Sequence, residues 1–286
     1  MKNCLEIKDL CKSYGDFALD HLNLTIPGGT IMGLIGENGA GKTTTIKCIL
    51  NLIRRDSGTI TILGKDNVAD ERAAKLEVGV VLDECFFHDS LRPKDLKRIL
   101  GPVYPTWDDN LYADYLKKFK LPEEKLIKEF SRGMKMKLSL AAALAHQPRL
   151  LILDEATAGL DPVVRDEILD EFLSFIQDES HAILISSHIT SDLEKAADYV
   201  TFLHQGRVVL QGAKDELLDT YGKLTCARSD LERVDRSLLA GVRTNQFGCE
   251  ALVKDRAVFR RAYPDLAVDP VSLEEIMVFT VKGESR

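Results

Sequence analysis

A glycine-rich stretch is the part of this sequence whose residue types point most directly to chemistry. Residues 36–44 read Gly-Glu-Asn-Gly-Ala-Gly-Lys-Thr-Thr, after the apolar run 30–35 and before the helix-like run 45–53. A strand, a glycine loop ending in Gly-Lys-Thr and a helix form, in this order, a phosphate-binding P-loop. Glycines let such a loop turn tightly and bring bare backbone N–H groups against phosphate oxygens. The N-terminus of the following helix adds partial positive charge.

The side chains of this loop predict a division of roles around a nucleoside triphosphate. Lys42 is expected to reach the β- and γ-phosphates, and the Thr43 hydroxyl to hold Mg²⁺. Thr44 is expected to donate a hydrogen bond near the α-phosphate. The other phosphate contacts are expected from the loop itself, at Gly36, Asn38, Gly39, Ala40 and Gly41.

A pair of acids follows the apolar run 150–153, which is typical of a buried strand. A strand that ends in an acid beside a P-loop predicts a Mg²⁺ partner. Asp154 would hold the metal, directly or through water, and Glu155 could polarise an attacking water. The alternative is a solvated acidic turn after a core strand, which the P-loop upstream makes the weaker interpretation.

Composition limits the class of protein. A chain of 286 residues with 45% hydrophobic and 29% charged residues is typical of a globular protein with one large domain, or a large one and a small one. The net charge of −7 argues weakly against a nucleic-acid binder. The six cysteines are scattered without a C-x-x-C pair. This spacing favours reduced, mostly buried thiols over a disulfide framework or a zinc site.

No targeting or spanning segment is expected. No apolar segment precedes Leu5, so a secretory signal is not predicted. No run approaches the roughly 18 apolar residues that a membrane-spanning helix needs. If this protein serves a membrane, another chain must supply the channel.

The pattern of strands and helices changes twice along the chain. Strand-like runs alternate with turns up to about residue 82, helical spacing dominates from about 88 to 147, and strands and helices then alternate. Beyond about residue 221 the pattern weakens, with a helix expected at 230–239, a strand at 251–253 and a helix or strand at 273–279. We therefore predict a main domain over 1–221, with a helical subdomain at about 88–147, and a small accessory domain over 222–286.

The order of the motifs resembles the ATP-binding cassette (ABC) family over about residues 4–220. Along the chain stand the P-loop, a helical stretch, Ser131-Arg132-Gly133, the Asp154-Glu155 pair, Ala-Gly-Leu-Asp at 158–161 and a lone His188 after a strand-like run. The combination is most similar to single-cassette ATPase subunits of bacterial exporters whose permease is a separate chain. It is much more specific than any one of its motifs.

The resemblance implies further roles. Tyr14 matches the position where the family stacks an aromatic ring on adenine, and its alternative is a Tyr in a turn over residues 12–15. Ser131 and Gly133 match the signature motif, which contacts the γ-phosphate of a nucleotide held by a partner subunit. His188 matches the switch histidine near the γ-phosphate and the attacking water, and Asp161 matches the loop that couples the two sites.

The implied fold is an α/β P-loop ABC cassette with a mainly parallel core sheet, an antiparallel β subdomain, a helical subdomain and a small C-terminal α+β domain. The implied cofactors are ATP and Mg²⁺. The implied partners are a second cassette, a homodimer being favoured over a heterodimer, and a separate integral-membrane permease. The chain would then lie in the cytoplasm at the inner face of the membrane and hydrolyse ATP to power transport, with export favoured. No nucleic-acid partner is expected.

Two rival functions stay open at this point. A soluble ABC-type ATPase that acts on ribosomes or nucleic acid usually carries two cassettes or long coiled-coil insertions, and this chain shows one cassette and no heptad run. A regulatory subunit could bind ATP and turn it over poorly. Glu155 and His188 argue against that interpretation, whereas Asp83 keeps it open.

Two departures from the family pattern concern the site. After the strand-like run 78–82, Asp83 stands where the family has a glutamine that contacts Mg²⁺ and the attacking water. A carboxylate can also ligate Mg²⁺, but without the metal it would repel phosphates, so ATP binding should depend strongly on Mg²⁺. Arg132 and Met134 replace the usual second and fourth signature residues.

Two aromatic residues, Phe86 and Phe87, follow Asp83 in the sequence. They could form a docking surface for a permease, or they could pack against the helical region.

Overall fold

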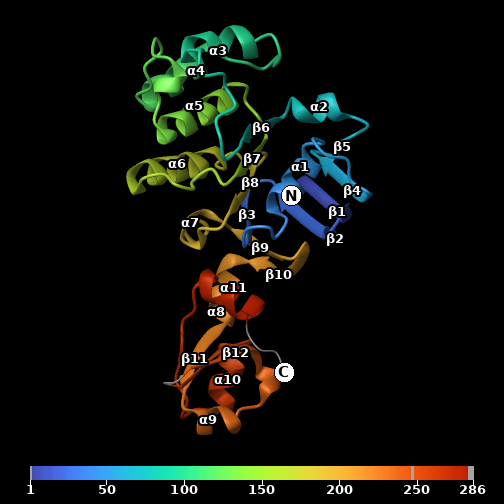
Figure 1. Cartoon of the computed structure of the whole chain (residues 1–286), viewed down its shortest axis with the longest axis vertical. Helices are drawn as coiled ribbons and strands as arrows, with labels where there is room; N and C mark the ends of the chain where they lie inside the picture. Colours follow the sequence, from blue (N-terminus) through green and yellow to red (C-terminus); the bar gives the residue numbers. More distant parts are fainter. Residues whose placement is uncertain (1, 246–247, 283–286) are drawn as a thin grey trace.

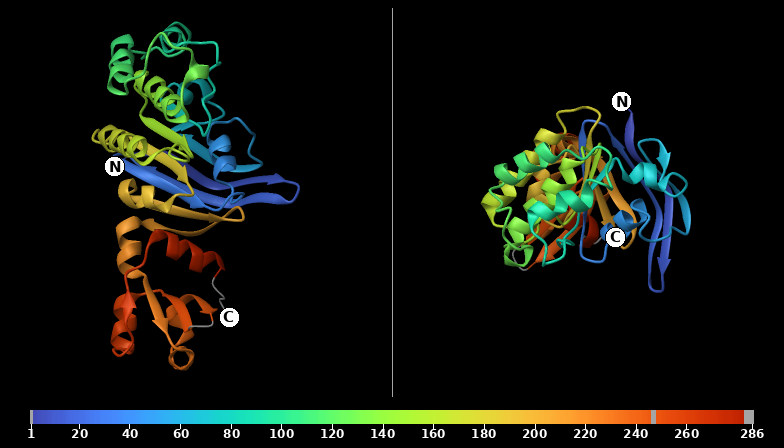
Figure 2. Two further views of the ribbon diagram at one scale, coloured as in Figure 1. Left: turned by 60° about the vertical axis from the view of Figure 1, so that its left-hand side comes forward. Right: turned by 90° about the horizontal axis from the view of Figure 1, so that it is seen from above.

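The computed structural model describes residues 2–245 and 248–282. Its long axis runs from a group of helices, through two sheets that lie beside each other, to a third sheet with its own helices (Figure 1). Figure 2 shows the same order from the side. The sheet that contains the N-terminal strands, in blue, projects from the rest of the molecule. Both predicted domain ranges reach residues outside the described part, at residue 1 and at 246–247 and 283–286.

The central sheet is parallel except at one edge. Its order is β10-β9-β3-β8-β7-β6, and only β10 runs antiparallel to its neighbour. Its strands are β3 (Thr30–Gly36), β6 (Val78–Val81), β7 (Leu150–Asp154), β8 (Ala182–Ser187), β9 (Tyr199–His204) and β10 (Arg207–Ala213). Every residue of β7 and β8 is buried, as expected for parallel strands covered on both faces. The predicted mainly parallel core is confirmed.

The second sheet is antiparallel and alternates buried and exposed residues. Its order is β2-β1-β4-β5, from β1 (Asn3–Tyr14), β2 (Phe17–Pro27), β4 (Ser57–Ile62) and β5 (Lys65–Asp66). The turn predicted over residues 12–15 is wrong in its first three residues. Tyr14 pairs with Phe17, so only Gly15 and Asp16 form the turn. Gly15 adopts φ +47°, the left-handed conformation that two-residue hairpin turns require.

The helical region packs on the central sheet through one continuous core. It contains α3 (Pro93–Leu100), α4 (Asp109–Lys118), the short helix η1 (Ile127–Glu129) and α5 (Arg132–Ala145). Tyr112 and Leu140 belong to the same buried cluster as Leu151 and Ile183 of the sheet. Asp108 caps α4 by accepting hydrogen bonds from two backbone N–H groups.

The remaining helices around the two sheets include the one that follows the P-loop. They are α1 (Lys42–Ile49), α2 (Glu71–Lys75), α6 (Pro162–Phe175), α7 (Thr190–Ala196) and α8 (Lys214–Thr220). The helix α1 begins at Lys42, three residues before the predicted start, so Lys42 and Thr43 lie in its first turn. Asp161 caps α6 and Pro162 occupies its first position, where a missing N–H costs nothing.

The third sheet lies at the C-terminal end, in the order β12-β13-β11-β14. Its elements are β11 (Gly222–Cys226), α9 (Arg228–Glu232), η2 (Arg236–Leu238), β12 (Leu239–Asn245), β13 (Gly248–Val253), α10 (Arg256–Ala262), β14 (Val268–Asp269) and α11 (Leu273–Lys282). The helix predicted over 230–239 is mostly wrong, because it ends at Glu232. The Asp235 side chain accepts a hydrogen bond from the N–H of Ser237 and so caps the short helix η2. The chain then continues into β12 at Leu239. The strand predicted at 251–253 and the helical alternative for 273–279 are confirmed.

Helix α11 joins the third sheet to the rest. The carboxylate of Glu194, on α7, accepts the backbone N–H of Leu273 at 2.7 Å. Ile276 and Phe279 of α11 belong to the core cluster of the central sheet. No helix in residues 2–245 and 248–282 is long and apolar enough to cross a bilayer.

Burial of His146 predicts a pH effect on stability. Its side chain is 2% exposed, its ring stacks on Tyr104 at 4.0 Å, and burial lowers the pKa of His146 to about 4. The unfolded chain takes up a proton near pH 6.5 and the folded chain does not, so this contribution to stability is present above pH 6.5 and is lost as pH falls toward 4. The loss at pH 5 is on the order of 2 kcal/mol.

Chemical denaturation of a His146→Phe variant tests this effect, because Phe keeps an aromatic ring and cannot titrate. The difference in unfolding free energy between pH 7 and pH 5 should be smaller in the variant than in the wild type by about that amount. An identical pH dependence of the two proteins would contradict the assignment.

Candidate nucleotide site

A cavity of about 510 Å³ lies over the P-loop, at the carboxyl ends of the central parallel strands, where ligands of open α/β sheets bind. Loop residues from Glu37 to Thr44 form its floor. The rest of its lining comes from five other parts of the chain, at Phe17, Asp83, Arg132, Glu155 with Ala158, and His188. The fold therefore gathers residues from the central sheet, the second sheet and the start of α5.

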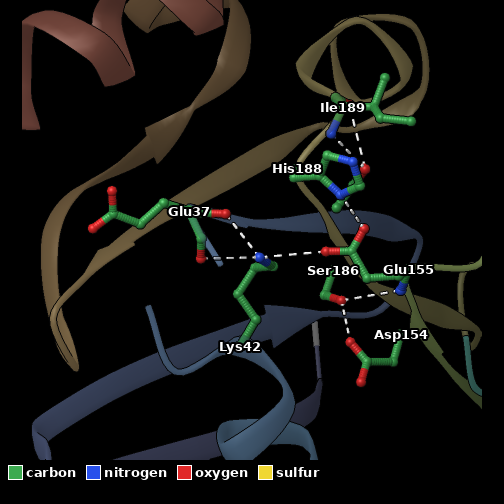
Figure 3. Close-up of polar contacts among 9 residues, drawn as sticks. Glu37, Lys42, Asp154, Glu155, Ser186, His188 and Ile189 are labelled. Carbon is green, nitrogen blue, oxygen red and sulfur yellow. Dashed lines mark hydrogen bonds and ion pairs between the residues drawn. The ribbon is translucent and has the colours of Figure 1, made fainter. Parts of the chain in front are cut away.

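Lys42 is the central cation of this cavity. Its side chain is 6% exposed, and its ammonium donates to the backbone carbonyl of Gly36 at 2.7 Å. The same ammonium lies 3.3 Å from the Glu155 carboxylate. A buried ammonium needs such partners because burying an unpaired charge costs several kcal/mol. Lys42 thus lines the cavity and points toward Glu155 (Figure 3).

Glu155 lies between Lys42 and His188. Its second carboxylate oxygen is 2.6 Å from Nδ1 of His188, whose ring is half exposed (Figure 3). The backbone at Glu155 has φ +52°, a left-handed conformation that costs a non-glycine residue about 1–2 kcal/mol. Its N–H is held by the backbone oxygen and the hydroxyl of Ser186. The end of β7, the strand β8 and the helix α1 therefore together position this carboxylate in the cavity.

Asp154 ends β7 one residue earlier and is nearly buried. The hydroxyl of Ser186, on the neighbouring strand β8, donates to its carboxylate. The parallel register that pairs Asp154 with Ser186 explains this contact. One serine thus orients both acids of the predicted pair, and Ser186 is a residue that sequence reasoning missed.

The P-loop is held down by a second turn. Gly206, between β9 and β10, donates its N–H to the carbonyl of Ala40 at 3.0 Å. Gly206 has φ +79°, and a Cβ there would lie 1.8 Å from the backbone oxygen of Ala18. Only glycine fits where these three segments meet.

Not every predicted site residue lies at this cavity. Asp83 and the loop residues Asn38 to Thr44 line it, whereas Gly36 meets it only through the carbonyl that accepts from Lys42. Tyr14 is absent from the lining, and its exposed ring lies under the Lys12 ammonium at 5.0 Å. Phe17, which the hairpin places opposite Tyr14, lines the cavity instead.

The two signature residues also lie away from the lining. Ser131 caps α5 by accepting the N–H of Met134, and a Cβ on Gly133 would lie 3.3 Å from Val164 of α6. Arg132, between them, does reach the cavity and packs over Gly159.

Comparison with known proteins agrees with this geometry. The model of the ABC transporter family matches residues 19–158. The bacitracin transport ATP-binding protein BcrA of Bacillus licheniformis is 36% identical over 220 residues, which cover 76% of this chain and 72% of that protein. The ABC transporter ATP-binding protein YtrB of Bacillus subtilis (strain 168) is 30% identical over 99% of both chains. This chain belongs to the ABC transporter ATP-binding family.

A solved structure described as an ATP-binding subunit of an ABC transporter has the same fold. Its TM-score is 0.69 at 28% identity, over 75% of this chain and 91% of that one. The chain is accordingly an ABC transporter ATPase, the ATP-binding subunit of a complex with membrane components. YtrB matches over nearly its full length, so the similarity extends into the region of the third sheet.

The ABC ATPase has an acidic cavity for a site that binds phosphates. Glu37, Asp83 and Glu155 line it, against the cations Lys42 and Arg132. An anionic nucleotide that enters this cavity meets three carboxylates against these two cations, and a cation that enters with the nucleotide further reduces the Coulomb repulsion.

Proposed function

We propose that this ABC ATPase powers export through a separate membrane permease by closing two cassettes around ATP and reopening after hydrolysis. One observation carries the proposal. Glu155, Lys42 and His188 are assembled in one cavity, while Ser131 and Gly133 of the same chain lie outside its lining. A second chain that presents its own Ser131 and Gly133 would complete the set of phosphate contacts. Export is favoured because the motif order resembles exporter-type cassettes.

The side chains support a specific division of work in hydrolysis. Lys42 and the P-loop N–H groups, with Thr44, bind the phosphate chain, and a phosphate at Lys42 competes with Glu155 for its ammonium. Glu155 orients the attacking water, and His188 holds the Glu155 carboxylate in place through Nδ1. Tyr14 or the neighbouring Phe17 would contact the adenine ring. Lys42 stabilises the charge that develops on the transferred phosphoryl group.

The donor set fits Mg²⁺, which prefers oxygen ligands. Thr43, Asp154 and Asp83 supply a hydroxyl and two carboxylates, and Thr43 and Asp83 line the cavity. These residues would hold the metal, which would supply positive charge against the phosphates.

An apolar hollow beside Asp83 suits the permease. It has a volume of about 280 Å³ and is lined by the strand β6, the following loop and α5. Phe86 is 72% exposed at its edge, whereas Phe87 packs on the central core, so the two aromatic residues divide the roles considered for them. A large exposed aromatic beside a hollow is typical of an interface for an apolar helix.

A photocrosslinking residue at position 86 tests this docking surface in cells. It should join the chain to an integral membrane protein with several spans, identified by mass spectrometry. The same residue at Val258, an exposed apolar position on α10, is the matched control and should not. Crosslinks from position 86 to other copies of this chain alone would contradict the placement.

Mixing two inactive variants tests whether two copies complete each other. Lys42→Ala removes the phosphate-binding ammonium, and Ser131→Asp keeps the cap of α5 but sets a negative charge against the γ-phosphate. In a homodimer a mixed pair holds one intact site, so an equimolar mixture should regain roughly a quarter of wild-type ATP hydrolysis. Each variant alone should stay inactive. No recovery on mixing would contradict a site shared between two copies and leave a different cassette as the partner.

The acidic lining predicts an unusual metal requirement. ATP affinity should fall by more than tenfold when Mg²⁺ is removed with a chelator, measured by titration of a fluorescent ATP analogue. Asp83→Asn removes one of the three carboxylates and should reduce this difference. Equal affinity with and without Mg²⁺ in the wild type would show that the carboxylates do not oppose ATP.

The chain organisation and location complete the proposal. We take residues 1–221 as the cassette, with about 88–147 as its helical subdomain, and 222–286 as the accessory domain, since the third sheet begins at Gly222. Packing of α11 against the cassette core makes the accessory domain a fixed attachment. The permease would hold the chain at the inner face of the cell membrane.

A further inference from the structure

Two of the six cysteines lie directly opposite each other in the third sheet. The antiparallel register of β11 and β13 pairs Cys226 with Cys249. Opposed residues in such a pair have Cα atoms about 4.5 or 5.5 Å apart and side chains on the same face. Both separations fall within the range of about 4.4–6.8 Å that a disulfide spans. The backbone thus already meets the main geometric requirement for a bond.

Both thiols point into the core of this sheet. Cys249 is 2% exposed and belongs to the buried cluster with Leu224 and Ala251, which are themselves an opposed pair two residues along. Cys226 is half-buried and packs against the same cluster. Thr244 of β12 lies beside Cys249, with its hydroxyl 3.7 Å from the sulfur. The two sulfurs are therefore confined on one face, with Cys226 as the one that solvent reaches.

The other cysteines lack this arrangement. Cys4 and Cys11 lie on β1, Cys48 on α1 and Cys85 in the loop after β6. In the strand pairings of the described residues none of these four stands opposite a cysteine. They provide internal controls of similar chemistry in the same chain.

We propose that Cys226 and Cys249 are a reversible modification site, in which hydrogen peroxide converts the two thiols into a cross-strand disulfide. The Cys226 thiolate attacks the peroxide oxygen, breaks the O–O bond and becomes a sulfenic acid, with loss of one water. The Cys249 sulfur then attacks the Cys226 sulfur and displaces the hydroxyl as a second water. The two thiols lose two electrons and two protons in total. A dithiol reductant returns them by thiol–disulfide exchange.

The surroundings set the character of this site. Burial and the neighbouring Cys249 raise the pKa of the Cys226 thiol, so it is mostly protonated at neutral pH. It should therefore react more slowly than a sensor thiol of low pKa. The bond would close a loop of 24 residues that contains α9 and β12, and a disulfide stabilises a fold by restricting the unfolded chain.

The bridged strands also hold α11. Lys223, three residues before Cys226, forms ion pairs with Glu250 of β13 and Glu275 of α11. Helix α11 contacts α7, which begins two residues after His188. A disulfide at this site would therefore stabilise the strands to which α11 is bound through Lys223.

Oxidation of the full chain with hydrogen peroxide tests the proposal. Free thiols are then blocked, and peptides are mapped by mass spectrometry without reduction. The expected product is a Cys226–Cys249 linked peptide, lighter by two hydrogens than the two thiol peptides and restored by dithiothreitol. The oxidised protein should also unfold at a temperature several degrees higher than the reduced protein.

Variants separate this bond from general oxidation. Cys226→Ser and Cys249→Ala should each abolish the rise in unfolding temperature, whereas a Cys11→Ser and Cys85→Ser double variant should keep it. The peptide mapping is done on the wild-type protein, so its result does not depend on whether the cysteine variants fold. Oxidation of Cys226 to a sulfinic acid with Cys249 still reduced, or linkage through the other four cysteines, would overturn the proposal.

Discussion

The ammonium of Lys42 is the charge around which the site is built. It is nearly buried, so its energy depends on the Gly36 carbonyl and the Glu155 carboxylate that contact it. Removing one partner of a buried charge typically costs about 3–5 kcal/mol, much more than the loss of a surface ion pair. The P-loop, the end of β7 and His188 are thereby fixed relative to one another. A phosphate that enters this cavity finds the cation already positioned.

The parallel sheet makes this arrangement possible. β3 leads into the P-loop, β7 ends at Asp154 just before Glu155, and β8 ends just before His188, and all three ends lie at one edge of the sheet. The register of β7 and β8 places Ser186 beside Asp154, where its hydroxyl contacts the Asp154 carboxylate and the backbone N–H of Glu155. The hydrogen bond from Gly206 to Ala40 fixes the P-loop to the turn between β9 and β10. Each contact follows from strand order, which explains why residues far apart in sequence act together.

Much of the fold could be predicted because its signals are local. The buried strands of the core are continuous apolar runs, and the P-loop has a fixed spacing of glycine and lysine. The C-terminal region was harder, since the stop of α9 depends on the Asp235 side chain and the third sheet on pairings between distant strands. Residues that act through register or packing, such as Ser186 and Phe17, carry no motif. The opposed Cys226 and Cys249 emerge only once β11 and β13 are aligned.

The measurement that tests the central claim most directly is the molecular mass of a Glu155→Gln variant in solution. This change removes the carboxylate that orients water and should trap the bound nucleotide. Size-exclusion chromatography with light scattering, run with ATP and Mg²⁺, should show a dimer that reverts to monomer when ATP is omitted. A variant that binds ATP and remains monomeric would contradict the account that two copies of this chain complete the site.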